Sequence, residues 1–489
     1  AGWRRFWFAL SSALVMHACA PEPRDDEAPA EHMLFVPSEG AMSGYYPVRI
    51  ALEAGLVSDA VEAVRFGPIA AYNLSPVDSA HLEVWVQGSS KPGPVDVEVD
   101  AGGATYTLSA PFMFEAPRLD GFQSMHAFGA SLTQGTQRGL PTQWSVQQGP
   151  AAQMARRLGL YFPLPMPLAE GFQEMTPDLI GAPPYCQPPA LDAYQTDQAL
   201  ALIPELTDPD TGDFSFRMVR VDPDLETHNV SVGGSRVGEI MEGPKEGDIP
   251  LEFLSHMVYE PWGTIGDPVA MSQLEMLQAA SPELIVSFDL LGNDLIDGMI
   301  DNADFKLTGM TPLDTYVADI ERLVSALAAT GAEVFLANLP NPVDLPFFRA
   351  KRARLAEEGL SENADLVFAA IDEGTQAANA RLNLEAERHL NVHVVDLASQ
   401  MRDWIADGVE VGEERLWVEQ YGGLVGLDGL HFSDTAYALV ANAMLRTINS
   451  VLDAEVPLID VGAVWAQDRE RPEALLAFGL EVSACQPAD

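Results

Sequence analysis

Residues 125–133 have the sequence Met-His-Ala-Phe-Gly-Ala-Ser-Leu-Thr, a short apolar run followed at once by Gly129 and Ser131. An apolar run of this length bounded by a glycine is typical of a buried β-strand. The glycine allows a sharp turn, and Ser131 would then stand where a sheet delivers its chain ends to a crevice. Taken alone the string is weak, because a solvated loop serine is its commoner explanation.

Apolar runs like this one recur along the chain and alternate with helical patterns. The candidate strands are residues 125–128, 284–288, 334–337 and 392–395. The candidate helices are residues 151–158, 315–329, 364–384 and 433–452. Strands that alternate with helices indicate a sheet covered by helices. We therefore predict an α/β fold over residues 119–455, a doubly wound three-layer domain with a mostly parallel sheet.

The preceding residues, 33–118, show a different pattern. Leu82, Val84 and Val86 alternate with their neighbours, and Val97 and Val99 do the same. This period of two predicts half-buried strands, and the Gly- and Pro-rich stretches 89–94 and 101–103 predict turns between them. A small all-β sandwich follows from this pattern.

Three stretches of this region resemble the immunoglobulin-like IPT/TIG modules. They are Val64-Arg-Phe-Gly67, the run 91–99, and the closing Ala110-Pro-Phe-Met-Phe114. The resemblance covers about eighty residues and implies an immunoglobulin-like sandwich. Two roles remain open for it, a spacer and a ligand-binding domain.

Residues 1–20 have the pattern of an export signal. Arg4 and Arg5 are basic, residues 6–16 are apolar, and Ala18-Cys19-Ala20 is a small-residue end. Two cleavage reactions fit: lipoprotein processing, which would lipidate Cys19, and ordinary signal peptidase. In the first case, residues 21–32 form a flexible tether. We expect an exported bacterial protein, either an outer-membrane lipoprotein facing periplasm or surface, or a secreted protein.

Three cysteines occur, and without Cys19 the remaining pair is Cys186 and Cys485. An exported pair favours one disulfide, which would pin the C-terminal tail, residues 456–489; two unpaired thiols are the alternative. We expect no metal site, because no His or Cys lies at ligand spacing from either thiol.

The sign of the charge is strongly biased, with 27 Lys and Arg against 72 Asp and Glu, a net charge of −45. Such a surface repels polyanions, so we expect no nucleic-acid partner. Solubility or adaptation to salt explains the acidity more simply than a cationic partner does.

A second polar string, Asp428-Gly-Leu-His431-Phe-Ser433, lies just before the last predicted helix. Its spacing lets the carboxylate reach the imidazole from the same turn. A serine hydroxyl needs a base to take its proton and a carboxylate to orient that base. His431 and Asp428 fit these roles for Ser131.

Gly-Ala-Ser131-Leu and Asp428-Gly-Leu-His431 resemble the first and last sequence blocks of the GDSL/SGNH hydrolases. Residues 229–235, Asn-Val-Ser-Val-Gly-Gly-Ser, look like the second block, and Leu-Gly-Asn-Asp at 291–294 looks like the third. The resemblance spans roughly residues 122–450. It implies a catalytic Ser131–His431–Asp428 triad.

The same resemblance implies an oxyanion hole formed by the N–H groups of Ser131 and Gly234 and the side-chain amide of Asn293. Such donors meet the negative charge that develops on the carbonyl oxygen. The sequence departs from the family at two positions: Ala130 replaces the aspartate of the first block, and Leu291 replaces the first glycine of the third. Neither change removes a donor or a proton-transfer group.

The function that the resemblance implies is hydrolysis of carboxylic esters through an acyl-serine intermediate. The expected partner is a small-molecule, lipid or polysaccharide ester, and we expect no cofactor. We also expect a monomer that meets the membrane only through an N-terminal lipid anchor. The alternative, motivated by Ala130 and Leu291, is a non-catalytic surface lipoprotein that binds carbohydrate on a hydrolase scaffold.

Overall fold

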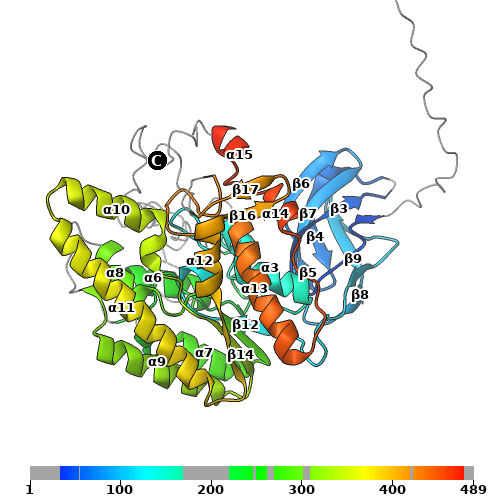
Figure 1. Cartoon of the computed structure of the whole chain (residues 1–489). Helices are drawn as coiled ribbons and strands as arrows, with labels where there is room; N and C mark the ends of the chain where they lie inside the picture. Colours follow the sequence, from blue (N-terminus) through cyan, green and yellow to red (C-terminus); the bar gives the residue numbers. More distant parts are fainter. Residues whose placement is uncertain are drawn as a thin grey trace, which may run out of the picture.

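The computed structural model describes residues 34–53, 55–168, 220–245, 249–261, 269–300, 309–418 and 422–477. The predicted export signal, the tether and all three cysteines lie outside these residues. A β region begins the described chain, and a larger α/β region follows it (Figure 1).

Short strands form three sheets in the N-terminal β region. Their orders are β1 (Phe35–Val36), β3 (Gly44–Ala51), β7 (His81–Gln87), β6 (Tyr72–Asp78); β10 (Ala104–Thr107), β9 (Val97–Ala101), β4 (Val61–Phe66), β5 (Ile69–Ala70); and β2 (Glu39–Gly40), β11 (Phe112–Phe114), β8 (Gly93–Val95). All pairs are antiparallel except β11 with β2. The alternating valines point into one core, as their spacing predicts. An immunoglobulin-like sandwich is not confirmed by these sheets.

The α/β region is built on one parallel sheet. It contains β12 (Met125–Ala127), β13 (Leu284–Ser287), β14 (Glu333–Ala337) and β15 (Val392–Val395), in chain order. All four predicted strands are therefore present, with ends that differ by no more than one residue. The doubly wound arrangement is not confirmed. It needs further strands on the outer side of β12, and there the described residues form an isolated parallel bridge between Ala127 and Asn229 instead of a strand.

Alternate residues of each strand enter two different cores. Ile285 of β13 packs into the core on one face of the sheet, whereas Leu284 and Val286 pack into the core on the other. Because both faces are covered, the strands are mostly apolar, and this made them recognisable in the sequence.

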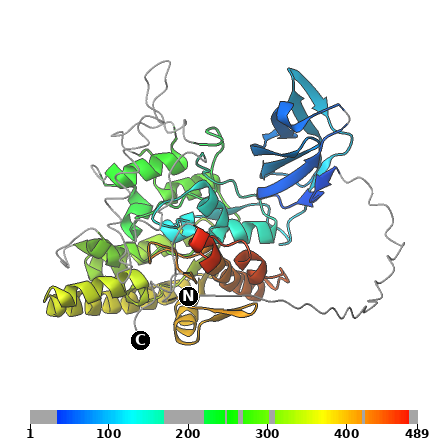
Figure 2. The same ribbon diagram turned by 90° about the horizontal axis from the view of Figure 1, so that it is seen from above.

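Helices line both faces of the sheet (Figures 1 and 2). The first core contains side chains of α5 (Val237–Glu242), α6 (Ile249–Tyr259), α7 (Gln273–Ala280), α8 (Asn293–Ile300), α9 (Leu313–Ala328), α10 (Pro346–Glu357) and α11 (Ser361–Ala386). The second contains side chains of α2 (Gln143–Gln148), α3 (Pro150–Leu158), α12 (Leu397–Asp407), the hairpin β16 (Val409–Val411) and β17 (Glu414–Leu416), α13 (Asp434–Leu452) and α14 (Val461–Trp465). α1 (Ser131–Gln134), α15 (Pro472–Ala477) and the 3₁₀ turns Ser58–Ala60 and Pro342–Asp344 complete the described helical elements.

The two regions pack against each other. Tyr45 and Tyr72 of the β region are buried in the second core of the α/β region. The Leu164 N–H donates to the Tyr45 hydroxyl at 2.7 Å, and the Asn73 amide donates to Gln143 at the start of α2 at 2.6 Å. The β region thus supports the face of the α/β region that carries α2 and α3.

Residues 456–477, the described part of the predicted tail, also pack on the α/β region. Val456 and Trp465 are buried in the second core beside α13. Asn449 of α13 exchanges two hydrogen bonds with the Val456 backbone, at 2.8 and 3.0 Å. In the part of the chain that the structure describes, no helix is both long enough and apolar enough to cross a membrane.

Candidate active site

Ser131 is the first residue of α1 and follows β12 through a tight turn. Gly129 in that turn has φ +131°, a conformation that favours glycine. A Cβ at this position would lie 2.7 Å from Ser287 Oγ, so no other residue fits without displacement. The turn leaves Ser131 partly exposed, while the residues that precede it, 125–130, are buried.

The carboxylate of Asp289 holds this turn in place. It accepts hydrogen bonds from the backbone N–H groups of Ala130 at 3.0 Å, Leu132 at 2.6 Å and Thr133 at 3.2 Å, and from the Thr133 hydroxyl at 2.6 Å. Burial raises the pKa of Asp289 above its ordinary value, and these hydrogen bonds oppose the rise. These contacts give Asp289 a hydrogen-bonding role in the turn.

Asp428 and His431 form a buried pair between β17 and α13. His431 Nδ1 lies 2.6 Å from Asp428 Oδ2, and the side chains are 4% and 1% exposed respectively. Oδ1 of the same carboxylate accepts the N–H groups of Leu430 and His431, both at 2.9 Å. Burial alone would raise the pKa of Asp428, but the charge of His431 and these hydrogen bonds outweigh it and hold the pKa below its ordinary value.

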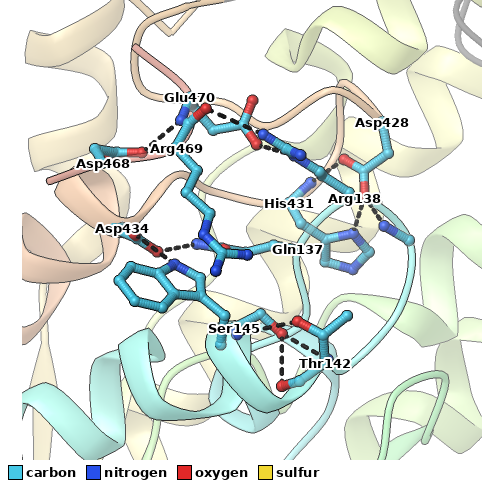
Figure 3. A network of polar contacts seen from close by, with 12 residues as sticks. Gln137, Arg138, Thr142, Ser145, Asp428, His431, Asp434, Asp468, Arg469 and Glu470 are labelled. Carbon is cyan, nitrogen blue, oxygen red and sulfur yellow. Dashed lines mark hydrogen bonds and ion pairs between the residues drawn. The ribbon is translucent and has the colours of Figure 1, made fainter. Parts of the chain in front are cut away.

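The chain after Ser131 lies directly against this pair. The Gly139 N–H donates to Asp428 Oδ2 at 2.6 Å (Figure 3), and the Thr136 carbonyl accepts from the Tyr437 hydroxyl at 2.5 Å. Among the hydrogen bonds of the described residues, none joins the Ser131 hydroxyl to His431. Catalytic hydrogen bonds of this kind are often long without substrate and tighten on binding.

Gly233 and Gly234 lie beside Ser131. A Cβ at Gly233 would stand 3.5 Å from Ser131 Cβ, and the Gly233 N–H donates to Gln134 at 3.2 Å. Gly234 follows with φ +88°, a left-handed conformation that favours glycine. The predicted second block therefore meets the first in space.

Asn293 joins this group from the start of α8. It is 7% exposed, and its Nδ2 donates to the Ser235 carbonyl at 2.9 Å. The side-chain amide has two N–H donors, so this bond leaves one for a ligand oxygen. The first three predicted blocks are thus joined by close contacts at the carboxyl ends of β12 and β13, the edge where open parallel sheets bind ligands, and the Asp428–His431 pair contacts the chain that follows Ser131.

One positioning residue, Gln273, was not predicted. Its side chain is 2% exposed and exchanges two hydrogen bonds with the Gly129 backbone, at 2.9 and 3.0 Å. Its Nε2 also donates to the Ser235 hydroxyl at 3.0 Å. It therefore ties the first block to the second, but a single glutamine at a helix start carries no motif that could have identified it.

The histidines outside the pair make structural contacts. His126 and His228 stack with ring centroids 3.8 Å apart, and burial lowers their pKa values to about 3 and about 4. His393 lies 2.9 Å from Glu333 across neighbouring strands. Among the described residues, no cluster of three or more His, Cys, Asp or Glu side chains is arranged to hold a metal ion.

Residues 208–444 match the family model described as GDSL-like lipase/acylhydrolase. The match includes Gly234, Asn293, Asp428 and His431. It begins after Ser131, so the assignment of the serine depends on the first-block string and the contacts described above. No curated protein matches the chain.

Similar solved structures share little identity with the chain. An acetyl xylan esterase is 11% identical, with 45% of this chain and 79% of that chain covered, at a TM-score of 0.25. A GDSL-like lipase from Bacteroides thetaiotaomicron is 16% identical, with 46% and 74% covered, at 0.23. TesA is 13% identical, with 67% and 99% covered, at 0.24. The family match shows that residues 208–444 are a domain of the GDSL-like lipase/acylhydrolase family.

Proposed function

We propose that the protein hydrolyses carboxylic esters through an acyl-Ser131 intermediate. The observation that carries the proposal is the buried 2.6 Å contact between His431 Nδ1 and Asp428 Oδ2, adjacent to the chain that follows Ser131. This contact places the Nδ1 proton toward the carboxylate, so Nε2 is the basic nitrogen. The family match supports the class of reaction.

In the first half of the reaction, Ser131 Oγ attacks the ester carbonyl carbon while His431 Nε2 takes its proton. The carbonyl oxygen becomes an anion, and the N–H groups of Ser131 and Gly234 and the Asn293 amide donate to it. The carbon–oxygen bond to the alcohol then breaks. His431 returns the proton to the leaving oxygen, and acyl-Ser131 remains.

In the second half, water attacks the acyl carbon and His431 takes a proton from it. The bond to Ser131 Oγ breaks, His431 protonates that oxygen, and the carboxylic acid leaves. Asp428 stabilises the imidazolium at each step and keeps its own charge.

Hydrolysis of p-nitrophenyl esters of short and long acyl chains tests the proposal. The wild type is expected to turn over at least one chain length, and Ser131→Ala to lose that activity. Asn293→Ala should lower kcat on the order of a hundredfold to a thousandfold, because it removes one oxyanion donor. The profile over acyl lengths identifies the substrate class among small, lipid and polysaccharide esters.

Two matched variants control for folding. Ser325→Ala changes an exposed serine of α9. Asn442→Ala removes a buried amide that bonds the Ile459 backbone at 3.0 Å, outside the site. Both should retain the wild-type kcat. Equal hydrolysis by the wild type and Ser131→Ala would refute the catalytic role of Ser131, and no hydrolysis of any ester by the folded wild type would favour the carbohydrate-binding alternative.

We further propose that the protein is exported and lipidated at Cys19. The support is the sequence pattern of residues 1–20, which lie outside the described residues. Incorporation of labelled palmitate in the cell is expected for the wild type and not for Cys19→Ser. Palmitate labelling that persists in Cys19→Ser would exclude the lipoprotein and leave secretion. The Cys186–Cys485 disulfide is tested by the same culture, through mass analysis of non-reduced peptides.

A further inference from the structure

A buried ion pair links the chain after Ser131 to the C-terminal residues beyond the family match. Arg138 Nε lies 2.5 Å from Glu470 Oε1, and the two side chains are 5% and 2% exposed. Arg138 Nη2 also donates to the Arg469 carbonyl at 3.1 Å. Figure 3 shows this pair beside the Asp428–His431 contact. Breaking such a pair is costly, because it leaves a charge uncompensated in the interior.

The backbone at Arg138 is strained. Its φ is +47°, in the left-handed region that side chains other than glycine rarely adopt, and Gly139 follows with φ +85°. Such strain persists when surrounding contacts enforce it, and it concentrates at functional sites. The two left-handed residues turn the Gly139 N–H toward Asp428.

The Gly139 N–H reaches the same carboxylate oxygen that faces the imidazole. It donates to Asp428 Oδ2 at 2.6 Å, and His431 Nδ1 lies 2.6 Å from that atom. With Oδ1 held by the N–H groups of Leu430 and His431, the carboxylate has one rotation that satisfies all four contacts. The Gly139 bond therefore contributes to the orientation of Asp428.

The C-terminal segment that carries Glu470 is itself anchored beside the pair. Asp468 Oδ1 accepts the Glu470 N–H at 2.8 Å. Its Oδ2 accepts the N–H of Thr435 at 2.8 Å and the Thr435 hydroxyl at 2.5 Å. Thr435 lies in the first turn of α13, four residues after His431. Residues 468–470 thus contact both the turn 137–139, through Arg138, and the start of α13, through Thr435.

We propose that Glu470 is a positioning residue for the catalytic pair: through Arg138 it keeps the turn 137–139 in the strained conformation that directs the Gly139 N–H onto Asp428 Oδ2. Glu470 touches neither substrate nor the reacting atoms. Its effect on turnover rests on the proposed function. Its effect on the Asp428–His431 contact does not, and can be measured without substrate.

Glu470→Gln tests this role, because it removes the charge and keeps the size of the side chain. Glu385→Gln is the matched control: Glu385 of α11 is 1% exposed and pairs with Arg381 at 3.0 Å and with Arg388, just beyond the helix, at 2.8 Å. Both variants should lower the denaturation midpoint. Only Glu470→Gln should lower kcat, on the order of ten- to a hundredfold with KM unchanged, as expected for misplacement of a catalytic group.

Proton NMR gives a second readout. The proton between His431 Nδ1 and Asp428 Oδ2 should resonate far downfield in the wild type and in Glu385→Gln. In Glu470→Gln this resonance should shift or broaden. If the wild type shows this resonance but has no esterase activity, the proposed function is refuted. The positioning role of Glu470 is then decided by comparing the resonance in the wild type and in Glu470→Gln.

A double variant guards against a folding failure. Arg138→Leu with Glu470→Leu removes the ion pair without leaving a buried unpaired charge, a replacement that proteins often tolerate. It should show the same loss of kcat and the same change in the resonance. Wild-type kcat and resonance in a folded Glu470 variant would overturn the proposal. So would an equal loss of kcat in Glu385→Gln.

Discussion

The carboxylate of Asp289 supports the turn that carries Ser131. Four donors from the turn converge on its carboxylate, three of them backbone N–H groups that would otherwise be buried without a partner. Buried N–H groups need such acceptors, since a lost partner costs free energy. The carboxylate therefore supplies the hydrogen-bond acceptors that the backbone of this turn requires.

Asp289→Asn should disturb both stability and turnover. The asparagine amide has the size of the carboxylate, but its NH₂ group is a donor. That group would face the backbone N–H groups of the turn, which are donors too. We expect the unfolding free energy to fall by about 3 kcal/mol and kcat to fall at least tenfold, because hydrogen bonds to charged groups are the stronger ones. Denaturant titration and ester hydrolysis measure the two effects.

Asp396→Asn is a suitable control for this variant. Asp396 is exposed and accepts the Ser399 N–H at 3.1 Å as the N-cap of α12. Asparagine caps helices about as well as aspartate, so neither stability nor kcat should change appreciably. Wild-type kcat in Asp289→Asn would show that the turn keeps its shape without the carboxylate.

The sequence predicted the residues that carry a motif and not those that support them. Ser131, Gly234, Asn293, Asp428 and His431 belong to ordered strings, and their catalytic roles stay predictions. Gln273 and Glu470 belong to none, because their partners Gly129 and Arg138 are 144 and 332 positions away in the chain. Such contacts exist only once the fold has formed.

At the scale of elements, full burial explains why the parallel strands were predictable. β12 to β15 are covered on both faces, so apolar residues dominate each strand, although β12 contains His126 and β15 contains His393. Helix α13 was predicted from residue 433 and begins at Asp434 with Ser433 as its cap. The order of the strands in the sheet could not be predicted in the same way, because an apolar run does not show which strands are neighbours.

Helix α7 begins with a capping box formed by Ser272 and Glu275. Its cap Ser272 accepts the Glu275 N–H at 3.2 Å, and Glu275 accepts the Ser272 N–H at 2.8 Å. The next residue is Gln273, which holds Gly129. Ser272→Ala should lower the unfolding free energy by about 1 kcal/mol, since capping serines contribute about that much. Chemical denaturation measures it.

The start of α11 provides the comparison. Ser361 is its first residue, and the helix has no side-chain capping bond there. Ser361→Ala should therefore change the unfolding free energy by less than about 0.5 kcal/mol. Equal losses in the two serine variants would contradict the capping role of Ser272.

At the scale of the whole molecule, acid should destabilise the protein. His126 and His228 are stacked against each other where β12 meets the 228–229 segment, and burial lowers their pKa values to about 3 and about 4, from 6.5. At these two histidines the unfolded chain therefore binds more protons than the folded chain below pH 6.5. Stability from this pair is complete above pH 6.5 and is lost as the pH falls toward 4.

His126→Phe should weaken this dependence. Between pH 6 and 4, each such histidine changes the unfolding free energy by up to about 1.4 kcal/mol per pH unit. Removing one should flatten the curve by that amount, while a phenyl ring keeps a stacking surface for His228. Denaturant titrations over this pH range measure the slope. A slope equal to that of the wild type would mean that His126 is protonated in the folded protein.

Covalent labelling with a fluorophosphonate, which reacts with activated serines, tests the assignment of Ser131 most directly. We predict a single adduct, located by peptide mass spectrometry on Ser131. It should be absent in His431→Ala and greatly slowed in Glu470→Gln. An adduct on a different serine, or none on a folded wild-type protein, would contradict the assignment of Ser131 as the nucleophile.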